Sequence, residues 1–449
     1  MMAAVQSTIA DVAPRIARGE LRAERLAEDA LNRIAELNPS LNAFITVTAE
    51  HALASARRAD KEIAGGRHRG PLHGIPISLK DLIDMQGVAT TAGSRLRAEH
   101  VARRDAPVTA RVREAGAVIV GKTNLHEFAF GTTSEDSAWG PARNPIDPTR
   151  SPGGSSGGSA IGVKTGMSFA SVGTDTGGSI RIPAAACGVV GLKPAWEEIS
   201  SHGVVPRSRQ LDHVGPLARS VVDAGVMYDV MRGASPAAIE QIALWGRRLG
   251  LLGGYFMDRI GEDVEVSILA TVDRLRRAGA SISDVTLPHA GDIAPVYLHL
   301  VLADGAAYHA TMLRDRPAAY TPNVRLRLEM GRYILAEDYV RALRGRAVIA
   351  REIERALEGV DALILPALAI PAPTIGEETV AVKGGREPVR NVMLRCTQPF
   401  NLSGHPAISV PCGTTPAGLP VGLQIVGRRA ATPELLRVAR SVEAALEHA

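Results

Sequence analysis

The chain has 449 residues, of which 45% are apolar and only 4% aromatic, and its formal net charge is +4. A chain of this length and apolar content can bury a large core, which excludes a low-complexity or disordered protein. The small charge imbalance and the few aromatics argue against a dedicated nucleic-acid binder, which clusters basic residues and stacks bases on aromatic rings. The three cysteines are too few and too scattered for a disulfide framework or a zinc site.

Apolar runs long enough to cross a membrane are absent from the sequence. Asp11 and Pro14 interrupt the N-terminal residues, so no apolar leader is recognised there. A spanning helix needs about 20 apolar residues, and the strongest run, over residues 361–373, is broken by three prolines. We therefore expect a soluble, cytoplasmic protein that does not associate with a membrane.

In chain order, the first predicted elements are helices. Apolar residues recur at helical spacing over residues 26–37, and the Asn38-Pro39 pair is expected to end that helix. A second helix is predicted over residues 49–64, because its apolar residues fall on one side and the glycine pair 65–66 follows. A third is predicted over residues 107–115, ended by Gly116.

Short apolar runs between and after these helices predict strands. They cover residues 75–80, 117–120 and 360–366, and a hairpin of residues 407–413 and 419–427. A helix from about residue 159 leads into another short strand, and a last helix is predicted over residues 433–446. Helices that alternate with buried strands predict an α/β protein with a largely buried sheet.

No internal repeat or linker divides the sequence, so we predict a single domain over residues 1–449. Length alone would suggest two or three domains, but that argument is weak beside the missing linkers. Within the domain we expect N-terminal helices over residues 1–70, a core over 71–220, a variable helical region over 230–345 that could form a cap, and the C-terminal part of the core over 360–449.

Two strings match known motifs but not the structural context of those motifs. Residues 116–123 read GAVIVGKT and fit the phosphate-binding loop, yet that loop has to follow a strand, and here the intervening residues form the strand. Residues 153–157 read GGSSG and fit the nucleophile elbow of α/β-hydrolases, yet the residues before them are rich in proline and form a loop. The histidines show no paired metal-binding spacing. We therefore expect neither a nucleotide nor a metal.

Glycine is concentrated around two groups of serines. Eleven of the 39 residues from 153 to 191 are glycine. The serines that stand directly within the glycine clusters are Ser155, Ser156 and Ser179. Glycine permits positive φ and a close approach of the backbone, so successive N–H groups can converge on one point, as an oxyanion hole requires. The alternative is a tight structural crossover, in which glycine lets a helix pack closely on the sheet.

A serine nucleophile needs a base, because its hydroxyl attacks poorly until a neighbour accepts the proton. No histidine lies between residues 127 and 201. One option is a triad with His202 or the Asp212-His213 pair, and the other is a lysine with a lowered pKa. Lys80 ends an apolar strand, where burial would disfavour its charge. The residues alone do not decide between these options and two further candidates, Lys164 and Lys193.

Several longer segments together resemble the amidase signature family. They are GIPISLKD, GKTNLHEFAFG, NPIDPTRSPGGSSGGSA, GTDTGGSIRIPAAACGVVGLKP, LDHVGPLARSV and LPVGLQIVG, and they cover most of the chain. The resemblance, which is to the bacterial-type amidases of the family, implies a single α/β domain with a mixed central sheet flanked by helices on both faces. It also implies a Ser–cis-Ser–Lys catalytic set and no cofactor.

Carried over by motif position, the resemblance assigns each catalytic role to one residue. Ser179 corresponds to the nucleophile, Ser155 to a bridging serine that follows a cis peptide, and Lys80 to the base. The resemblance also implies an oxyanion hole of backbone N–H groups and supporting side chains around it. The oxyanion residues are Thr176, Gly177, Gly178 and Ser179, and the supporting residues are Ser156, Asp175 and Arg181.

The chain departs from the family pattern at two places. Glu197-Glu198 stands where many relatives carry Gly-Arg, and residues 207–210, RSRQ, replace the usual small serines before LDHVGP. From the second departure we assign Arg209 to the substrate pocket, with a solvated loop as the alternative.

The resemblance implies a hydrolase that cleaves the C–N bond of small amides through a Ser179 acyl-enzyme, with esters and carbamates (urethanes) as further substrates. The expected partner is then a small molecule, without nucleic acid or membrane, and the protein is expected to be a monomer or homodimer. The alternative is a glutamine-dependent amidotransferase subunit of the A type, which acts in a tRNA-modifying complex. A third interpretation is an inactive interaction protein.

Overall fold

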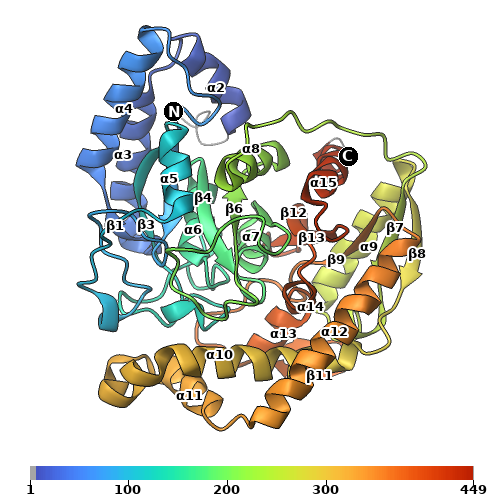
Figure 1. The fold of residues 1–449 in the computed structure, drawn as a ribbon. Helices are drawn as coiled ribbons and strands as arrows, with labels where there is room; N and C mark the ends of the chain where they lie inside the picture. Colours follow the sequence, from blue (N-terminus) through green and yellow to red (C-terminus); the bar gives the residue numbers. More distant parts are fainter. Residues whose placement is uncertain (1–6, 448–449) are drawn as a thin grey trace.

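A large sheet runs through the molecule and joins segments from both ends of the chain (Figure 1). The computed structural model describes residues 7–447. In spatial order, the strands of this sheet are β1 (Phe44–Val47), β3 (Val118–Thr123), β2 (Pro76–Lys80), β4 (Ala170–Asp175), β6 (His213–Ala218), β5 (Val190–Lys193), β12 (Ala407–Thr414), β13 (Pro420–Val426), β9 (Ala362–Pro366), β7 (Arg248–Leu252) and β8 (Ser281–Val285). A separate ribbon pairs β10 (Thr379–Val382) with β11 (Gly385–Pro388).

The strand directions make the sheet mixed. β2 is parallel to both of its neighbours, β3 and β4, and β7 is parallel to β8 and β9. β12 and β13 form an antiparallel hairpin that joins β5 on one side to β9 on the other. The predicted α/β fold with a mixed central sheet is therefore confirmed. Because β2 is an interior strand, every one of its residues is buried.

Helices cover both faces of the sheet, and the alternation of side chains along a strand shows this directly. On β3, Val118 and Val120 belong to one hydrophobic cluster and Ile119 to another, because successive side chains point to opposite faces. The first cluster includes residues of α3 (Ala23–Leu41), α4 (Ala49–Ala64) and α6 (Gly157–Thr165). The second includes residues of α2 (Ile9–Ala17), α5 (Pro107–Glu114), α8 (Val221–Arg232), α9 (Glu262–Arg277) and α15 (Thr432–Glu447).

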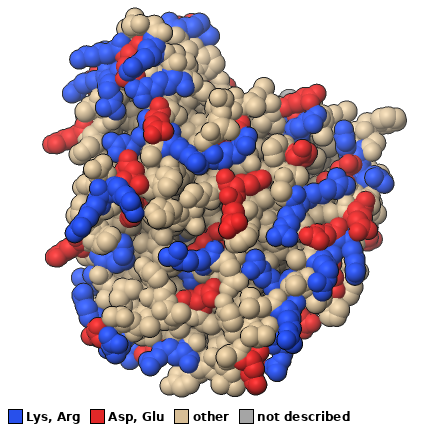
Figure 2. Space-filling model, viewed as in Figure 1, with Lys and Arg blue, Asp and Glu red and all other residues tan. Residues whose placement is uncertain are grey.

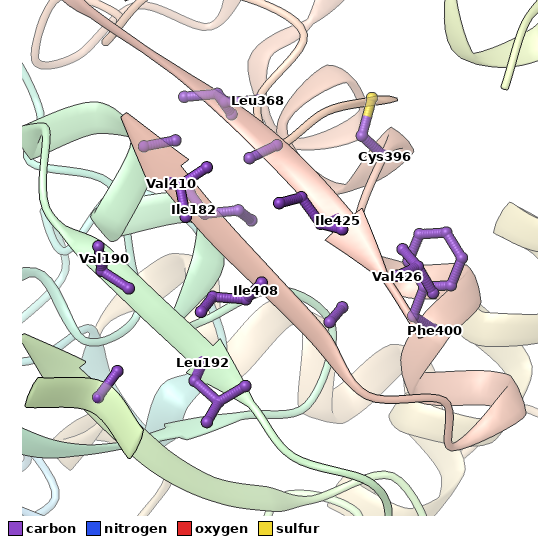
Figure 3. Packing of buried hydrophobic residues seen from close by; sticks show 14 of the residues in the cluster. Ile182, Val190, Leu192, Leu368, Cys396, Phe400, Ile408, Val410, Ile425 and Val426 are labelled. Carbon is purple, nitrogen blue, oxygen red and sulfur yellow. The ribbon is translucent and has the colours of Figure 1, made fainter. Parts of the chain in front are cut away.

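The C-terminal hairpin packs against elements from the middle of the chain. Figure 3 shows Val190 of β5 beside Ile408 and Val410 of β12, and all three side chains are fully buried. Ile182 of α7 (Arg181–Cys187) lies next to Val410, and α7 also contacts β13. The helix that follows Ser179 is thus held by the last strands of the chain.

The first helix of the sequence prediction ends later than expected. α3 continues through Pro39 to Leu41, and Asn42, with φ of 51°, ends it. A proline removes one backbone donor, but this close to the helix end few bonds are affected, and the Asn42 N–H donates to the Asn38 carbonyl as a cap. The predicted second helix has the observed bounds of α4.

The region 230–345 is not wholly helical, contrary to expectation. Its strands β7 and β8 complete one edge of the sheet, and both are only five residues long. The side chains of β8 are partly or fully exposed, so the strand lacks the apolar signal of a buried one.

The other helices around this part of the chain are α10 (Ile293–Asp315), α11 (Pro322–Gly331), α12 (Ala336–Glu358), α13 (Val389–Arg395) and α14 (Gln398–Ser403). Short 3-10 turns are η1 (Arg95–Arg97), η2 (Glu127–Ala129), η3 (Gly254–Phe256), η4 (Ala290–Asp292) and η5 (Pro317–Ala319).

Charged side chains of both signs are interspersed on the surface. The face in Figure 2 carries neighbouring basic and acidic groups rather than one basic stripe. Exposed pairs such as Arg25 with Asp29 on α3 illustrate this mixing. Over the described part of the chain, no helix combines the length and the apolar character needed to cross a bilayer.

Candidate active site

Lys80 is the last residue of β2, and its side chain is fully buried. Its Nζ donates to Ser155 Oγ at 2.7 Å and to Thr174 Oγ1 at 2.9 Å. Burial lowers the pKa of Lys80 well below its ordinary value, and the nearby Asp175 carboxylate offsets only part of this effect. The amine is therefore held towards the neutral state, which can accept a proton.

Backbone contacts bring the two serine segments together. The Gly154–Ser155 peptide is cis, which is the geometry that the resemblance implies for the bridging serine. The Ser156 N–H donates to the Ser179 carbonyl at 3.2 Å, and Ser156 Oγ donates to the Thr174 carbonyl at 3.2 Å. Ser155 and Ser179 are both buried. Lys80, Ser155 and the Ser179 loop therefore lie in one enclosed site.

Close packing explains the concentration of glycine here. A Cβ atom at Gly158 would lie 2.3 Å from the carbonyl oxygen of Ala43. Gly178, next to the predicted nucleophile, has a φ of +141°, which L side chains rarely adopt. Some of these glycines therefore permit tight packing, and Gly178 lets the loop before Ser179 curve.

A buried ion pair fixes the loop that carries Ser179. Asp175 accepts hydrogen bonds from Nε and Nη2 of Arg181, each at 2.9 Å, and both side chains are fully buried. The same carboxylate accepts the N–H groups of Gly178 at 2.7 Å and Ile180 at 3.2 Å. Burial acts to raise the pKa of Asp175, but the charge of Arg181 outweighs it and the pKa is lowered. The carboxylate stays ionised and ties both sides of Ser179 to one point.

Arg181 is in turn held by residues from the end of the chain. Its Nη1 donates to the Thr397 carbonyl at 2.9 Å and to Gln424 Oε1 at 2.7 Å. Its Nη2 donates to Asn401 Oδ1 at 2.7 Å, and Asn401 Nδ2 donates to Asp175 Oδ1 at 2.8 Å. A buried charge is stable when its hydrogen bonds are satisfied in this way. Asp175 and Arg181 lie where the supporting role assigned to them would require.

Three of the four backbone N–H groups that we assigned to the oxyanion hole are without an acceptor. The fourth, the N–H of Gly178, donates to Asp175. Those of Thr176, Gly177 and Ser179 have no hydrogen-bond acceptor among residues 7–447. The hydroxyl of Thr176 donates to Asp212 Oδ1 at 2.6 Å, which leaves its N–H free. Thr176, Gly177 and Ser179 are therefore the candidates to bind an oxyanion, and Gly177 and Ser179 lie closest to the Ser179 side chain in sequence.

The other candidate bases contact neither serine. His202 is exposed, while His213, Lys164 and Lys193 all contact backbone carbonyl groups. Within the described residues, Lys80 is the one candidate base that is hydrogen-bonded to a predicted catalytic serine.

The string that fits the phosphate-binding loop, residues 116–123, has an ordinary structural role. Gly116 follows α5 with φ of +85°, and the residues after it form β3, as the sequence predicts. Lys122, the lysine of that string, is buried and pairs with Asp81, with Nζ 2.9 Å from Oδ1. In the part of the chain that the structure describes, no three metal-binding side chains come together.

Sequence reasoning did not identify several residues around the site. They include Thr174, which contacts Lys80, and Arg207, whose guanidinium carbon lies 4.9 Å from the ring centroid of Phe130. Arg207 is buried, whereas Arg209, which we assigned to the pocket, is exposed and lines a surface cavity of about 350 Å³. The string RSRQ points to this loop, but nothing in four consecutive polar residues indicates which arginine turns inward.

A family model named Amidase matches residues 25–436. The chain belongs to the amidase family. The resemblance identified from the sequence motifs is thereby confirmed, and the site described above lies wholly within the matched residues.

Relatives of this amidase-family protein cover nearly its whole length. The A-type subunit of glutamyl-tRNA(Gln) amidotransferase from Roseiflexus sp. (strain RS-1) is 38% identical, over 96% of this chain and 95% of the relative. A crystal structure of an amidase superposes with a TM-score of 0.93 at 37% identity, covering 98% of this chain and 100% of the other. The corresponding amidotransferase subunit from Thermotoga maritima superposes with a TM-score of 0.81 at 32% identity, covering 99% and 95%.

Replacing Asp175 by Asn should destabilise this amidase-family protein strongly. Asp175→Asn leaves the buried Arg181 without its counter-charge, and breaking a buried pair costs about 3–5 kcal/mol. We expect a loss of this size in the free energy of unfolding, measured by urea denaturation.

Asp29→Asn is the matched control, because Asp29 forms an exposed pair with Arg25, and such pairs contribute about 0–1 kcal/mol. A loss for Asp175→Asn no larger than that of the control would contradict the structural role of the buried pair.

Replacing Lys80 by Met should raise the free energy of unfolding at neutral pH, and this gain should become smaller as the pH rises. Unfolded lysine has a pKa of about 10.4, and the folded pKa of Lys80 is lower. Between the two values the unfolded chain binds more protons, so wild-type stability rises with pH by about 1.4 kcal/mol per unit. Lys80→Met lacks this contribution, so its advantage should narrow between pH 7 and pH 10 in urea unfolding. An advantage that stays constant or widens would show that Lys80 is charged in the folded protein.

Proposed function

We propose that the protein cleaves the C–N bond of an amide through an acyl-enzyme on Ser179. The observation that carries the proposal is the 2.7 Å contact between Lys80 Nζ and Ser155 Oγ in a site that excludes water from the amine. A neutral lysine that touches a serine is the base of Ser–Lys hydrolases, and here the contact is made next to a loop with unused backbone donors.

The chemistry follows from these contacts in two halves. As Ser179 Oγ attacks the carbonyl carbon, its proton passes to Ser155, and Ser155 gives its own proton to neutral Lys80. The N–H groups of Gly177 and Ser179 stabilise the oxyanion, where removal of one donor typically costs about 10²–10³ in rate. The proton then returns through Ser155 to the leaving amine, whose C–N bond breaks. Water releases the acyl group by the same relay.

Two biological settings fit this chemistry. The first is a stand-alone hydrolase of small amides, which would also accept esters and carbamates because all three pass through the same type of oxyanion. The TM-score of 0.93 with a crystal structure of an amidase supports this setting, since it exceeds the 0.81 found for the amidotransferase subunit of T. maritima.

The second setting is an amidotransferase subunit of the A type. The curated relative from Roseiflexus, 38% identical over nearly the whole chain, is such a subunit, and this supports the second setting more directly than the superposition supports the first. A protein of this type functions beside a partner protein, in contrast to the monomer or homodimer that the sequence led us to expect. In this setting the amide would be glutamine and the released ammonia would pass to a tRNA-bound substrate.

Covalent labelling tests the chemistry that both settings share. We expect a fluorophosphonate probe to form one adduct, on Ser179, and Ser179→Ala and Lys80→Met to abolish it by removing the nucleophile and the base. Peptide mapping of the adduct by mass spectrometry is the measurement. Thr165→Ala is a control outside the site, since the hydroxyl of Thr165 donates to the Ile161 carbonyl within α6. Labelling at another residue, or undiminished labelling of Ser179→Ala, would contradict the proposal.

The pH dependence of kcat/KM should show the titration of Lys80. Because Lys80 has to be neutral to accept a proton, activity should fall as the pH drops below its lowered pKa, and the rate of fluorophosphonate labelling should fall with it. A flat profile over the acidic range in which the protein remains folded would exclude Lys80 as the base.

The two settings separate in one assay of the purified chain. Turnover of simple amides without any partner supports the stand-alone hydrolase. Turnover of glutamine only when a partner protein and tRNA are added supports the amidotransferase setting.

A further inference from the structure

Three arginines from separate segments lie within electrostatic range of one another near the predicted active site. Arg207 precedes β6, Arg327 lies on α11 and Arg390 lies on α13. Burial, together with the positive charges of Arg327 and Arg207, lowers the pKa of Arg390 to about 9. Arg390 therefore remains charged at neutral pH, and its guanidinium group lies within electrostatic range of the other two.

The guanidinium groups of this cluster are incompletely used. Nε and Nη2 of Arg390 and Nε of Arg207 are buried and have no hydrogen-bond partner among the described residues. Arg327 Nη1 donates to the Phe130 carbonyl at 2.7 Å, and Arg207 lies over the ring of Phe130. Buried polar atoms in folded proteins are nearly always hydrogen-bonded, so donors left over in this number indicate a ligand.

The cluster also lacks a counter-charge. Among residues 7–447, no ion pair includes Arg207, Arg327 or Arg390. The nearest carboxylates are already engaged: Asp212 accepts hydrogen bonds from the hydroxyl of Thr176 and the N–H of Arg207, and Asp136 lies against His126 and Asn323. One buried and two half-buried positive charges without a paired anion are unfavourable, and an anionic ligand would reduce that cost.

A tyrosine connects the cluster to the reacting atoms. The hydroxyl of Tyr297, on α10, is buried without a partner among the described residues, and a Cβ atom at Gly177 would lie 2.2 Å from it. Burial raises the pKa of Tyr297, so the hydroxyl stays protonated and can donate. Arg207 also lines a narrow cavity together with Thr174 and Thr176. Tyr297 and Arg207 therefore adjoin the loop that would bind the oxyanion.

We propose that Arg207, Arg390 and Tyr297 hold a carboxylate of the substrate, so that the amide cleaved at Ser179 is a net anion, such as the monoamide of a short dicarboxylic acid. This inference rests on the proposed amide cleavage and adds the class of substrate. Guanidinium groups pair with carboxylates through two parallel hydrogen bonds, which favours a planar carboxylate. The position of Tyr297 over Gly177 places that carboxylate a few bonds from the scissile carbonyl.

The charge of the cluster also argues for a substrate without an ammonium group. Arg207 and Arg390 would both repel a cation, and the nearby carboxylate of Asp212 is occupied by Thr176 and by the backbone of Arg207 and Ser208. Glutamine carries a carboxylate and an ammonium group on the same carbon, whereas glutaramate is the same amide without the ammonium. The two molecules therefore form a matched pair of probes.

Binding to Ser179→Ala protein tests the inference without requiring turnover. Isothermal titration calorimetry would compare glutaramate, its neutral isostere glutaramide, and glutamine. We expect glutaramate to bind about 10- to 100-fold more tightly than glutaramide, the range of a charge-assisted hydrogen-bond pair, and more tightly than glutamine. Equal affinity for glutaramate and glutaramide, or tighter binding of glutamine, would overturn the inference.

Variants then locate the site. In the Ser179→Ala background, Arg390→Gln and Arg207→Gln should each reduce the preference for glutaramate over glutaramide by about 10-fold or more, and Arg390→Lys should reduce it less because it keeps the charge. Arg325→Gln is the matched control on α11, because Arg325 is exposed and pairs with Glu329 on the surface. Thermal midpoints confirm folding of each variant. An unchanged preference in both charge-removing variants of the cluster would assign the anion to another site.

The binding test of the carboxylate site and the labelling test of amide cleavage can fail independently of each other. Failure of Ser179 labelling with a clear preference for glutaramate would refute amide cleavage while leaving an anion site. Labelling of Ser179 without that preference would leave amide cleavage intact and refute the carboxylate site.

Discussion

The contact between Lys80 and Ser155 depends on burial, and much of the structure serves to keep it buried. A lysine at the end of an exposed strand would be charged and would compete poorly for a serine proton. Here the strand lies between two parallel neighbours, and the hydroxyl of Ser155 accepts a hydrogen bond from the enclosed amine. The cost of removing the amine from water lowers its pKa, so the burial that weakens the fold locally is also what the proposed chemistry requires.

The Asp175–Arg181 pair has the opposite effect, because it stabilises the loop that carries Ser179. The Asp175 carboxylate accepts hydrogen bonds from the N–H groups on both sides of Ser179. The Arg181 guanidinium, which balances its charge, donates hydrogen bonds to residues of α14 and β13. The result is a rigid backbone whose remaining N–H groups point away from the protein's own acceptors. Beyond this loop lies the cluster of Arg207, Arg327 and Arg390. The charges on one side of the site are therefore balanced within the protein, and those on the other side are not.

The sequence was informative where chemistry and local pattern coincide. The contact between Lys80 and Ser155 agrees with the prediction that both belong to one site, which rested on short motif strings. The helix α4 and the strand β9 followed from apolar periodicity and from the glycines that bound the segments. The high glycine content of residues 153–191 also indicated the segment in which the backbone curves. The order of strands in the sheet did not follow from any local signal, because β5 and β12 are neighbours only through contacts between distant parts of the chain.

The basic cluster lay outside what sequence reasoning could find. Arg207, Arg327 and Arg390 lie in three segments with no shared motif, and an arginine in a polar string is most often solvated. Only the fold shows that Arg327 of α11 and Arg390 of α13 lie within electrostatic range of Arg207. For the same reason the sequence does not show which arginine of residues 207–210 is buried, since orientation within an irregular loop is set by its neighbours in space.

The dependence of Arg181 on Gln424 has a consequence for how the protein is made. The ribosome synthesises the segment with all three predicted catalytic residues long before it synthesises β13. Until then the guanidinium of Arg181 lacks its acceptors on α14 and β13, and α7 lacks the hairpin on which it packs. The nascent chain thus contains all three predicted catalytic residues without the contacts that align them, and the predicted active site forms only when synthesis is nearly finished.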